Sequence, residues 1–184
     1  PGVPYVAVVT SFDNGVQFAF DLTITFAATT TAAPTPTGDY CDTDCSLSGD
    51  TTGQPTFNRP SSGSGLSSSA TAVHYQAFPF HVSSDAGVYT INLLPTNPAT
   101  DTFLLLYSPS FDPSNPLQNK IALNDDDNTI GIGSTIAGLS LSPGVPYIAV
   151  VTSTSNGVEF AFDLTVTFSA IVAPTFTEAF CNTN

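Results

Sequence analysis

The densest group of metal-ligand side chains in this sequence is the run Asn124-Asp125-Asp126-Asp127-Asn128. Carboxylate and amide oxygens that converge from one loop are the ligands that a hard cation such as Ca²⁺ prefers. We expect Asp101 and Asp112 in neighbouring loops, where they could complete the coordination shell. An EF-hand is excluded, because this run has no acidic residue at the twelfth loop position. The sequence leaves two interpretations open, a calcium site and a solvated turn that binds no metal.

The cysteine spacing indicates a small disulfide loop. Cys41 and Cys45 are separated by three residues, and Cys181 takes the position of Cys41 in a second copy of the same segment. Two cysteines in a Thr/Pro-rich junction predict a Cys41–Cys45 disulfide and therefore an oxidising compartment. A zinc site and unpaired thiols are the alternatives, although no second Cys or His pair lies nearby in the sequence.

Residues that could carry catalysis are few. The two histidines, His74 and His81, lie on one predicted strand at an odd spacing. The sequence contains neither a G-x-S-x-G motif nor an H-E-x-x-H motif. We therefore expect a protein without enzymatic activity.

The charge balance narrows the range of partners. The formal net charge is −13, and Arg59 and Lys120 are the only Lys or Arg residues. Phosphate contacts need clustered basic side chains, so nucleic acid is not an expected partner. Anionic membrane surfaces are disfavoured for the same reason. No apolar run reaches the length of about 18 residues that a membrane-spanning helix needs.

The elements that must position these residues include a duplicated stretch. Residues 1–28 match residues 143–170 at 22 of 28 positions, and residues 33–44 match residues 173–184. A repeat spacing of 140 to 142 residues predicts tandem whole domains rather than a solenoid of small units.

Each copy of this stretch predicts two β-strands. In the second copy, residues 147–152 are mostly apolar, and residues 158–168 alternate strictly between apolar and polar. Asn156-Gly157 supplies a tight turn between them, so we predict a β-hairpin. An isolated hairpin is marginal in water, so residues 1–28 must pair with strands elsewhere. The assembly contacts are expected from Val3, Tyr5, Val8, Phe18, Phe20, Leu22, Ile24 and Phe26.

The remaining pattern predicts an all-β protein, an antiparallel two-sheet β-sandwich of jelly-roll or immunoglobulin-like type. Helix formers are scarce, with no Met and two Lys plus Arg. Residues 101–107 form a continuous apolar run, which predicts a central strand buried on both faces. Residues 73–82 change phase near Phe78, which predicts a β-bulge. Other strands are expected at residues 88–94, 121–124 and 130–141.

These elements define four predicted segments. Residues 1–28 are the closing hairpin of a preceding or donated module, and residues 29–48 are a Thr/Pro-rich linker with the cysteine loop. Residues 49–170 are a complete module, and residues 171–184 start the next linker. The linker threonines are candidate O-glycosylation sites, with an undecorated linker as the alternative. These threonines are Thr29, Thr30, Thr31, Thr35 and Thr37.

A series of landmarks over about residues 56–168 resembles a known family. In order they are F-x-V, G-x-Y-T, D-x-F-L-L-L-Y, F-D-P-x-x-P-L-x-N, N-D-D and P-G-V-P-Y-x-x-V-V-T. This order resembles the bacterial pre-peptidase C-terminal β-sandwich, especially the form repeated in large secreted or surface proteins. The resemblance implies a non-catalytic, extracellular, jelly-roll-like accessory domain that is often tandem and sometimes binds calcium.

Three functions fit these observations. The first is a structural subunit of an extracellular fibre or surface stalk, whose partners are copies of itself and which carries covalent glycans. Its modules are either repeated within one long polypeptide or joined by strand donation between chains. The second is an adhesin or carbohydrate-binding module that uses the surface of Tyr5, Tyr40, Tyr75, Tyr89 and Tyr107. The third is an accessory domain of a secreted enzyme.

Overall fold

The computed structural model describes residues 44–85, 87–126 and 133–171. These residues form nine strands and no helix, so none of the described ranges contains a helix that could cross a membrane. The strands are β1 (Cys45–Asp50), β2 (Thr56–Phe57), β3 (Val73–Phe80), β4 (Gly87–Pro95), β5 (Thr102–Tyr107), β6 (Lys120–Asn124), β7 (Ser134–Leu139), β8 (Tyr147–Ser153) and β9 (Ala161–Ala170). The first strand thus begins at Cys45, within the predicted linker.

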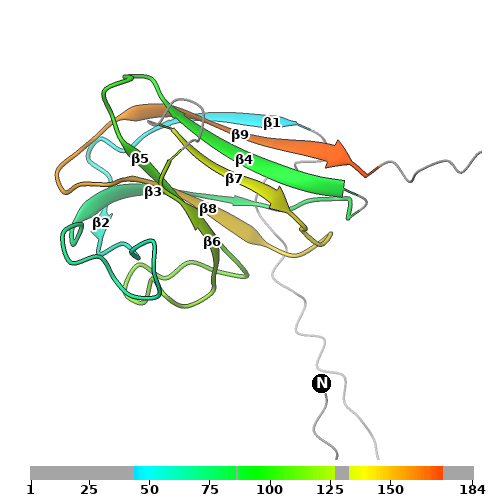
Figure 1. Ribbon diagram of the computed structural model, residues 1–184, viewed down its shortest axis with the longest axis horizontal. Helices are drawn as coiled ribbons and strands as arrows, with labels where there is room; N and C mark the ends of the chain where they lie inside the picture. The colour runs from blue at the N-terminus through cyan, green and yellow to red at the C-terminus, as the bar shows by residue number, and fades with distance from the viewer. Residues whose placement is uncertain (1–43, 86, 127–132, 172–184) are drawn as a thin grey trace, which may run out of the picture. The chain divides into compact units, whose positions relative to one another are not determined.

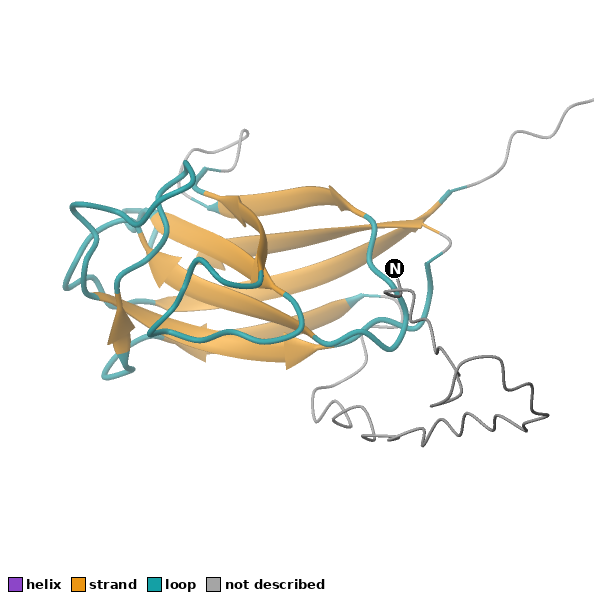
Figure 2. Cartoon of the chain, turned by 90° about the horizontal axis from the view of Figure 1, so that it is seen from below, coloured by secondary structure: helices purple, strands orange, loops and turns teal. Residues whose placement is uncertain are grey.

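The strands form two antiparallel sheets that lie face to face (Figures 1 and 2). The four-stranded sheet has the order β1-β9-β4-β7, and the five-stranded sheet has the order β2-β3-β8-β5-β6. The predicted all-β, two-sheet sandwich is confirmed.

Two apolar clusters hold the sandwich together. The inner cluster lies between the sheets and includes Ile91, Leu104, Leu106, Val151 and Leu164. The outer cluster lies on the opposite face of the five-stranded sheet, and its members are Phe57, Ala70, Val73, Phe103, Leu105, Tyr107 and Val150. Alternate side chains of β5 therefore enter different clusters, because successive residues of a strand point to opposite faces. This confirms the prediction that β5 is a central strand buried on both faces.

The two clusters also explain the change of phase in β3. Val73 belongs to the outer cluster with Tyr75 packed against it, whereas Phe80 belongs to the inner cluster with Phe78 packed against it. The register of β3 with β8 is unbroken from the pair Tyr75–Thr152 onwards. The predicted bulge near Phe78 is therefore wrong. The strand serves two apolar surfaces in turn and needs no extra residue.

The predicted hairpin over residues 147–168 is also wrong. Strand β8 pairs with β3 and β5 in one sheet, and β9 pairs with β1 and β4 in the other. The two strands face each other across the core and share no ladder of hydrogen bonds. A turn signal and an alternating strand are common to a hairpin and to a connection between sheets, so the local pattern could not separate them. We call residues 147–170 the arch.

Candidate functional site: the arch of β8 and β9

The arch contributes one internal strand to each of the two sheets, so neither sheet is continuous without it. Strand β8 lies between β3 and β5, and β9 lies between β1 and β4. Both backbone edges of each strand are therefore paired within the sandwich. Four of the most deeply buried side chains of the inner cluster, Ala149, Val151, Phe162 and Leu164, come from the arch.

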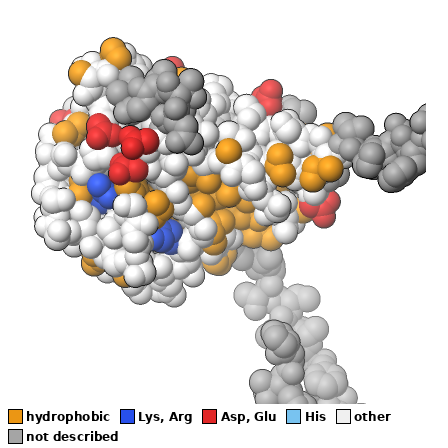
Figure 3. All heavy atoms as spheres, in the orientation of Figure 1, with side chains coloured by type: hydrophobic (Ala, Val, Ile, Leu, Met, Phe, Trp, Pro, Cys, Tyr) orange, Lys and Arg blue, Asp and Glu red, His pale blue; other side chains and the backbone are white. Residues whose placement is uncertain are grey.

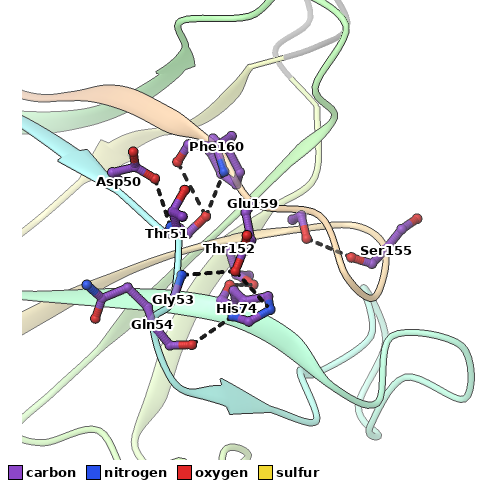
Figure 4. A network of polar contacts seen from close by, with 11 residues as sticks. Asp50, Thr51, Gly53, Gln54, His74, Thr152, Ser155, Glu159 and Phe160 are labelled. Atoms are coloured by element: carbon purple, nitrogen blue, oxygen red, sulfur yellow. Dashed lines mark hydrogen bonds and ion pairs between the residues drawn. The ribbon is translucent and has the colours of Figure 1, made fainter.

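Hydrogen bonds fix the connection between the two strands to the segment after β1 (Figure 4). Thr51 and Phe160 form a reciprocal contact: the Thr51 amide donates to the Phe160 carbonyl at 2.9 Å, and the Phe160 amide donates to the Thr51 Oγ1 at 2.9 Å. Thr51 is fully buried, so these bonds satisfy backbone groups that water cannot reach. The contact between Thr51 and Phe160 therefore fixes the position at which the chain enters β9.

Glu159 links the same connection to the five-stranded sheet. Its Oε1 accepts a hydrogen bond from the Gly53 amide at 2.9 Å and lies 3.4 Å from Nε2 of His74. His74 Nδ1 in turn lies 2.7 Å from the Gln54 carbonyl oxygen. One carboxylate therefore ties together the segment after β1, the strand β3 and the arch, as Figure 4 shows.

The turn at the tip of the arch is held by a third set of contacts. The Asn156 side-chain oxygen accepts a hydrogen bond from the Ala72 amide at 2.8 Å. Gly157 has a positive φ of 72°, a conformation that suits glycine. The Asn-Gly signal in the sequence thus marked a real turn, although it joins strands of different sheets.

Glu159→Gln is expected to lower the free energy of unfolding by about 0.2–1 kcal/mol, because the His74 contact is partly exposed and the amide oxygen can still accept from Gly53. The contact is attractive only when the His74 imidazole is protonated. The measurement is therefore a double-mutant cycle with His74→Gln, by urea unfolding at low salt and pH 5. The matched control is Asp163→Asn on the exposed face of β9, which does not contact His74. A coupling energy of zero at low salt would contradict an attractive contact between His74 and Glu159.

Arg59 is a buried cation beside the arch, and its contact with an aromatic ring was not predicted from the sequence. It is only 7% exposed, its guanidinium carbon lies 3.9 Å from the centre of the Phe103 ring, and its Nη2 donates to the Thr154 carbonyl at 3.1 Å. Burial lowers the pKa of Arg59, and the charges of Asp125 and Asp101 oppose that shift. Burial raises the pKa of Asp125, and the positive charge of Arg59 opposes that rise. Figure 3 shows carboxylates gathered beside the basic side chains on this face.

The residues predicted to bind calcium have different environments. The side-chain oxygen of Asn124 accepts a hydrogen bond from the Thr135 amide at 3.1 Å. Asp112 accepts from the amide and hydroxyl of Ser114 at 2.9 and 2.7 Å, which lowers the pKa of Asp112. Asp127 lies outside the described residues, and Asp126 is exposed. Within the described ranges, no group of three or more His, Cys, Asp or Glu side chains could hold a metal ion. The calcium site stays a prediction.

Most of the predicted linker and assembly residues lie outside the described residues. This holds for Cys41, for the threonines from Thr29 to Thr37 and for the assembly residues from Val3 to Phe26. Cys45 is described and begins β1. Its pairing with Cys41 stays a prediction.

The sequence matches no protein-family model, and no curated protein matches it. The structure is similar to the pre-peptidase C-terminal domain of a collagenase from Bacillus anthracis, with 16% identity, 70% of this chain and 93% of that chain covered, and a TM-score of 0.42. The first similarity is to a domain of the family that the sequence landmarks resemble.

A second similar structure is PliG of Aeromonas hydrophila, a periplasmic inhibitor of g-type lysozyme. The identity is 15%, 70% of this chain and 88% of that chain are covered, and the TM-score is 0.38.

Proposed function

We propose that this chain is a structural subunit of an extracellular fibre or surface stalk, in which modules are joined end to end. In this proposal residues 1–28, the N-terminal copy of the arch, supply the β8 and β9 strands of another module. The observation that carries the proposal is the match between this copy and an arch whose strands lie at the centres of two sheets.

The differences between the two copies barely affect the side chains that pack the core. The six differing pairs are Val6 and Ile148, Phe12 and Thr154, Asp13 and Ser155, Gln17 and Glu159, Ile24 and Val166, and Ala27 and Ser169. Val166 is the one member of the inner cluster among them, and its counterpart Ile24 adds one methylene. Core positions tolerate a hydrophobic swap of this size at modest cost. The N-terminal copy therefore carries the side chains that an arch needs.

The backbone of an arch explains why such a copy needs a module to receive it. In residues 147–170 each strand is hydrogen-bonded on both edges, to β3 and β5 or to β1 and β4. A copy without those neighbours would leave its backbone donors and acceptors to water and its apolar side chains exposed. A module in which these four neighbours are not occupied by an arch of its own would satisfy these groups.

The other expected features fit the same role. A Cys41–Cys45 disulfide and O-linked sugar on the linker threonines suit a protein outside the cell. Calcium at the acidic loop would be an additional stabilising ligand. By contrast, the adhesin alternative loses aromatic surface, because Tyr89 and Tyr107 are fully buried and Tyr75 packs edge-on against Phe57 and Phe111.

The test is the substitution Leu22→Asp. Its counterpart Leu164 is 1% exposed, so an aspartate at this position of an inserted arch would be buried without a partner. We expect Leu22→Asp to abolish assembly, measured by electron microscopy and light scattering, while the unfolding transition of the module at residues 44–171 is unchanged. The matched control is Thr25→Asp, because its counterpart Thr167 faces solvent. Unchanged assembly in the Leu22→Asp protein would refute the proposed role of the N-terminal copy.

A further inference from the structure

We infer that β6 forms a docking edge for a second copy of this chain, in which the two β6 strands pair antiparallel about a two-fold axis. The docking edge is residues 120–126, which comprise β6 and the two residues after it. Strand β6 is the last strand of the five-stranded sheet, so this pairing would join two such sheets into one. The inference goes beyond the proposed function, because none of these residues belongs to the N-terminal copy of the arch.

The first step is the free side of β6. Strand β5 pairs with β6 from Leu104–Asn124 to Tyr107–Lys120, and no other described strand pairs with β6. Strand β7 reaches only the C-terminal end of β6, where the Thr135 amide donates to Oδ1 of Asn124 at 3.1 Å. Successive residues of an antiparallel strand direct their backbone groups to opposite sides, so alternate groups of β6 face away from β5. Such a side is a template for another strand.

The second step is the apolar surface at this edge. Ile121 is 50% exposed, the largest exposed fraction of any large apolar side chain in the described strands. Ala122 of β6 and Leu139 of β7, the last strand of the other sheet, are only partly buried against the inner cluster. Figure 3 shows apolar side chains exposed beside the basic side chains on this face. A second copy that covers these side chains removes apolar surface from water, which favours association.

The third step is the charge of the docking edge, which has opposite signs at its two ends. Lys120 begins the edge, and Asp125 and Asp126 end it. Because Arg59 is buried, Lys120 is the only Lys or Arg of the sequence at the surface, and it forms no ion pair within the described residues. A chain with a net charge of −13 repels a second copy in most orientations. Antiparallel docking edges instead bring Lys120 of each copy beside the acidic end of the other.

The fourth step is why the partner is a second copy. A lysine on an edge strand usually opposes pairing, because the incoming strand must accommodate its charge. The docking edge of a second copy supplies the opposite charge, and it does so at both ends because the contact is two-fold. Such a contact closes after two copies, so it builds no fibre by itself. In the proposed fibre it would join modules of neighbouring fibres side by side.

The experiment measures dimerisation of the full chain in the Leu22→Asp background, which blocks the proposed end-to-end assembly. The method is sedimentation velocity at protein concentrations up to about 100 μM, a range suited to a small interface. We expect a monomer–dimer equilibrium at low salt. Added salt should shift it towards the monomer, because the charge pairs lie at the surface.

Charge reversal at the two ends tests the orientation of the copies. Lys120→Glu and Asp126→Lys should each raise the Kd of the dimer by about 10-fold or more, because like charges then meet at both ends. An equimolar mixture of these two variants should form a heterodimer, since one copy carries carboxylates at both ends and the other carries lysines at both ends. The variant with both substitutions should dimerise like the Leu22→Asp parent.

Two controls separate this contact from other effects. Asp126→Lys makes the chain less negative, so it would tighten association if overall repulsion alone set the affinity. Asp163→Lys on β9 makes the same charge change outside the docking edge and should not weaken the dimer. Far-ultraviolet circular dichroism identifies the variants that fold. A monomeric parent at the highest concentration, an Asp126→Lys dimer as tight as the parent, or folded single variants that do not associate when mixed would each overturn the inference. Because Leu22→Asp is present in every sample, these outcomes leave the proposed function standing.

Discussion

Phe103→Ala is expected to lower the free energy of unfolding by about 3–5 kcal/mol, the range found when a large buried aromatic side chain is deleted. Phe103 is fully buried in the outer cluster, and its ring carries the guanidinium of Arg59 on one face. Truncation would leave a cavity in the outer cluster and would remove the ring that faces this charge. Urea unfolding of the full chain measures the loss.

Phe103→Leu is the matched control, because it keeps most of the apolar volume but removes the ring. We expect it to cost less than half as much as the alanine substitution. Phe111→Ala, at a half-buried position packed against the same outer cluster, should also cost less. Equal losses for Phe103→Ala and Phe103→Leu would mean that packing volume does not hold the outer cluster together.

Arg59→Ala is the second substitution with a large expected effect, about 2–4 kcal/mol at neutral pH. The substitution removes the donors that reach the carbonyl oxygens of Pro60 and Thr154, at 2.9 and 3.1 Å. It also removes the positive charge that compensates Asp125, whose Oδ1 is buried without a hydrogen-bond partner among the described residues. The loss should therefore contain a packing component and an electrostatic component.

The electrostatic component has a defined dependence on pH. Burial raises the pKa of Asp125 in the folded state, so ionisation of Asp125 opposes folding, and stability from this group falls as the pH rises through the folded pKa. Arg59 reduces that penalty. The loss caused by Arg59→Ala should therefore be smaller at pH 4 than at pH 7, measured by urea unfolding at both values. In an Asp125→Asn background the difference between the two pH values should become smaller, because only the interaction of Arg59 with Asp101 then remains. A loss independent of pH in the wild-type background would contradict the electrostatic component.

The strands were predictable because their apolar pattern depends only on local alternation. The continuous apolar run of β5 predicts a strand buried on both faces, and all its residues are buried in the structure. Local alternation does not, however, predict which strands pair with one another. Whether Tyr147–Ser153 and Ala161–Ala170 pair with each other or with other strands depends on distant neighbours, the farthest being Cys45, which lies opposite Val166, 121 residues along the chain. The phase change in β3 was misread because one strand contributes to two apolar clusters.

The polar contacts of the candidate site were largely beyond sequence reasoning. Glu159 occupies a polar position in an alternating strand pattern, where an exposed side chain is the ordinary expectation. Its contacts with Gly53 and His74 join residues 106 and 85 positions away. Arg59 was visible as one of two basic residues in an acidic chain, but no local pattern indicates that it lies against Phe103. Among the polar contacts of the candidate site, only those of the Asn156-Gly157 turn lie at a position that the local sequence pattern predicted.

The pairing of β1 with β9 also has a mechanical consequence for a fibre. Because β1 starts beside the end of β9, the chain enters and leaves the sandwich at the same end (Figure 1). A stretching force applied between those two points would open the β1–β9 ladder one rung at a time, from Cys45–Val166 towards Asp50–Ala161, instead of loading all its rungs together. The sandwich would thus yield at low tension, and modules joined in the proposed fibre would form extensible, spring-like links.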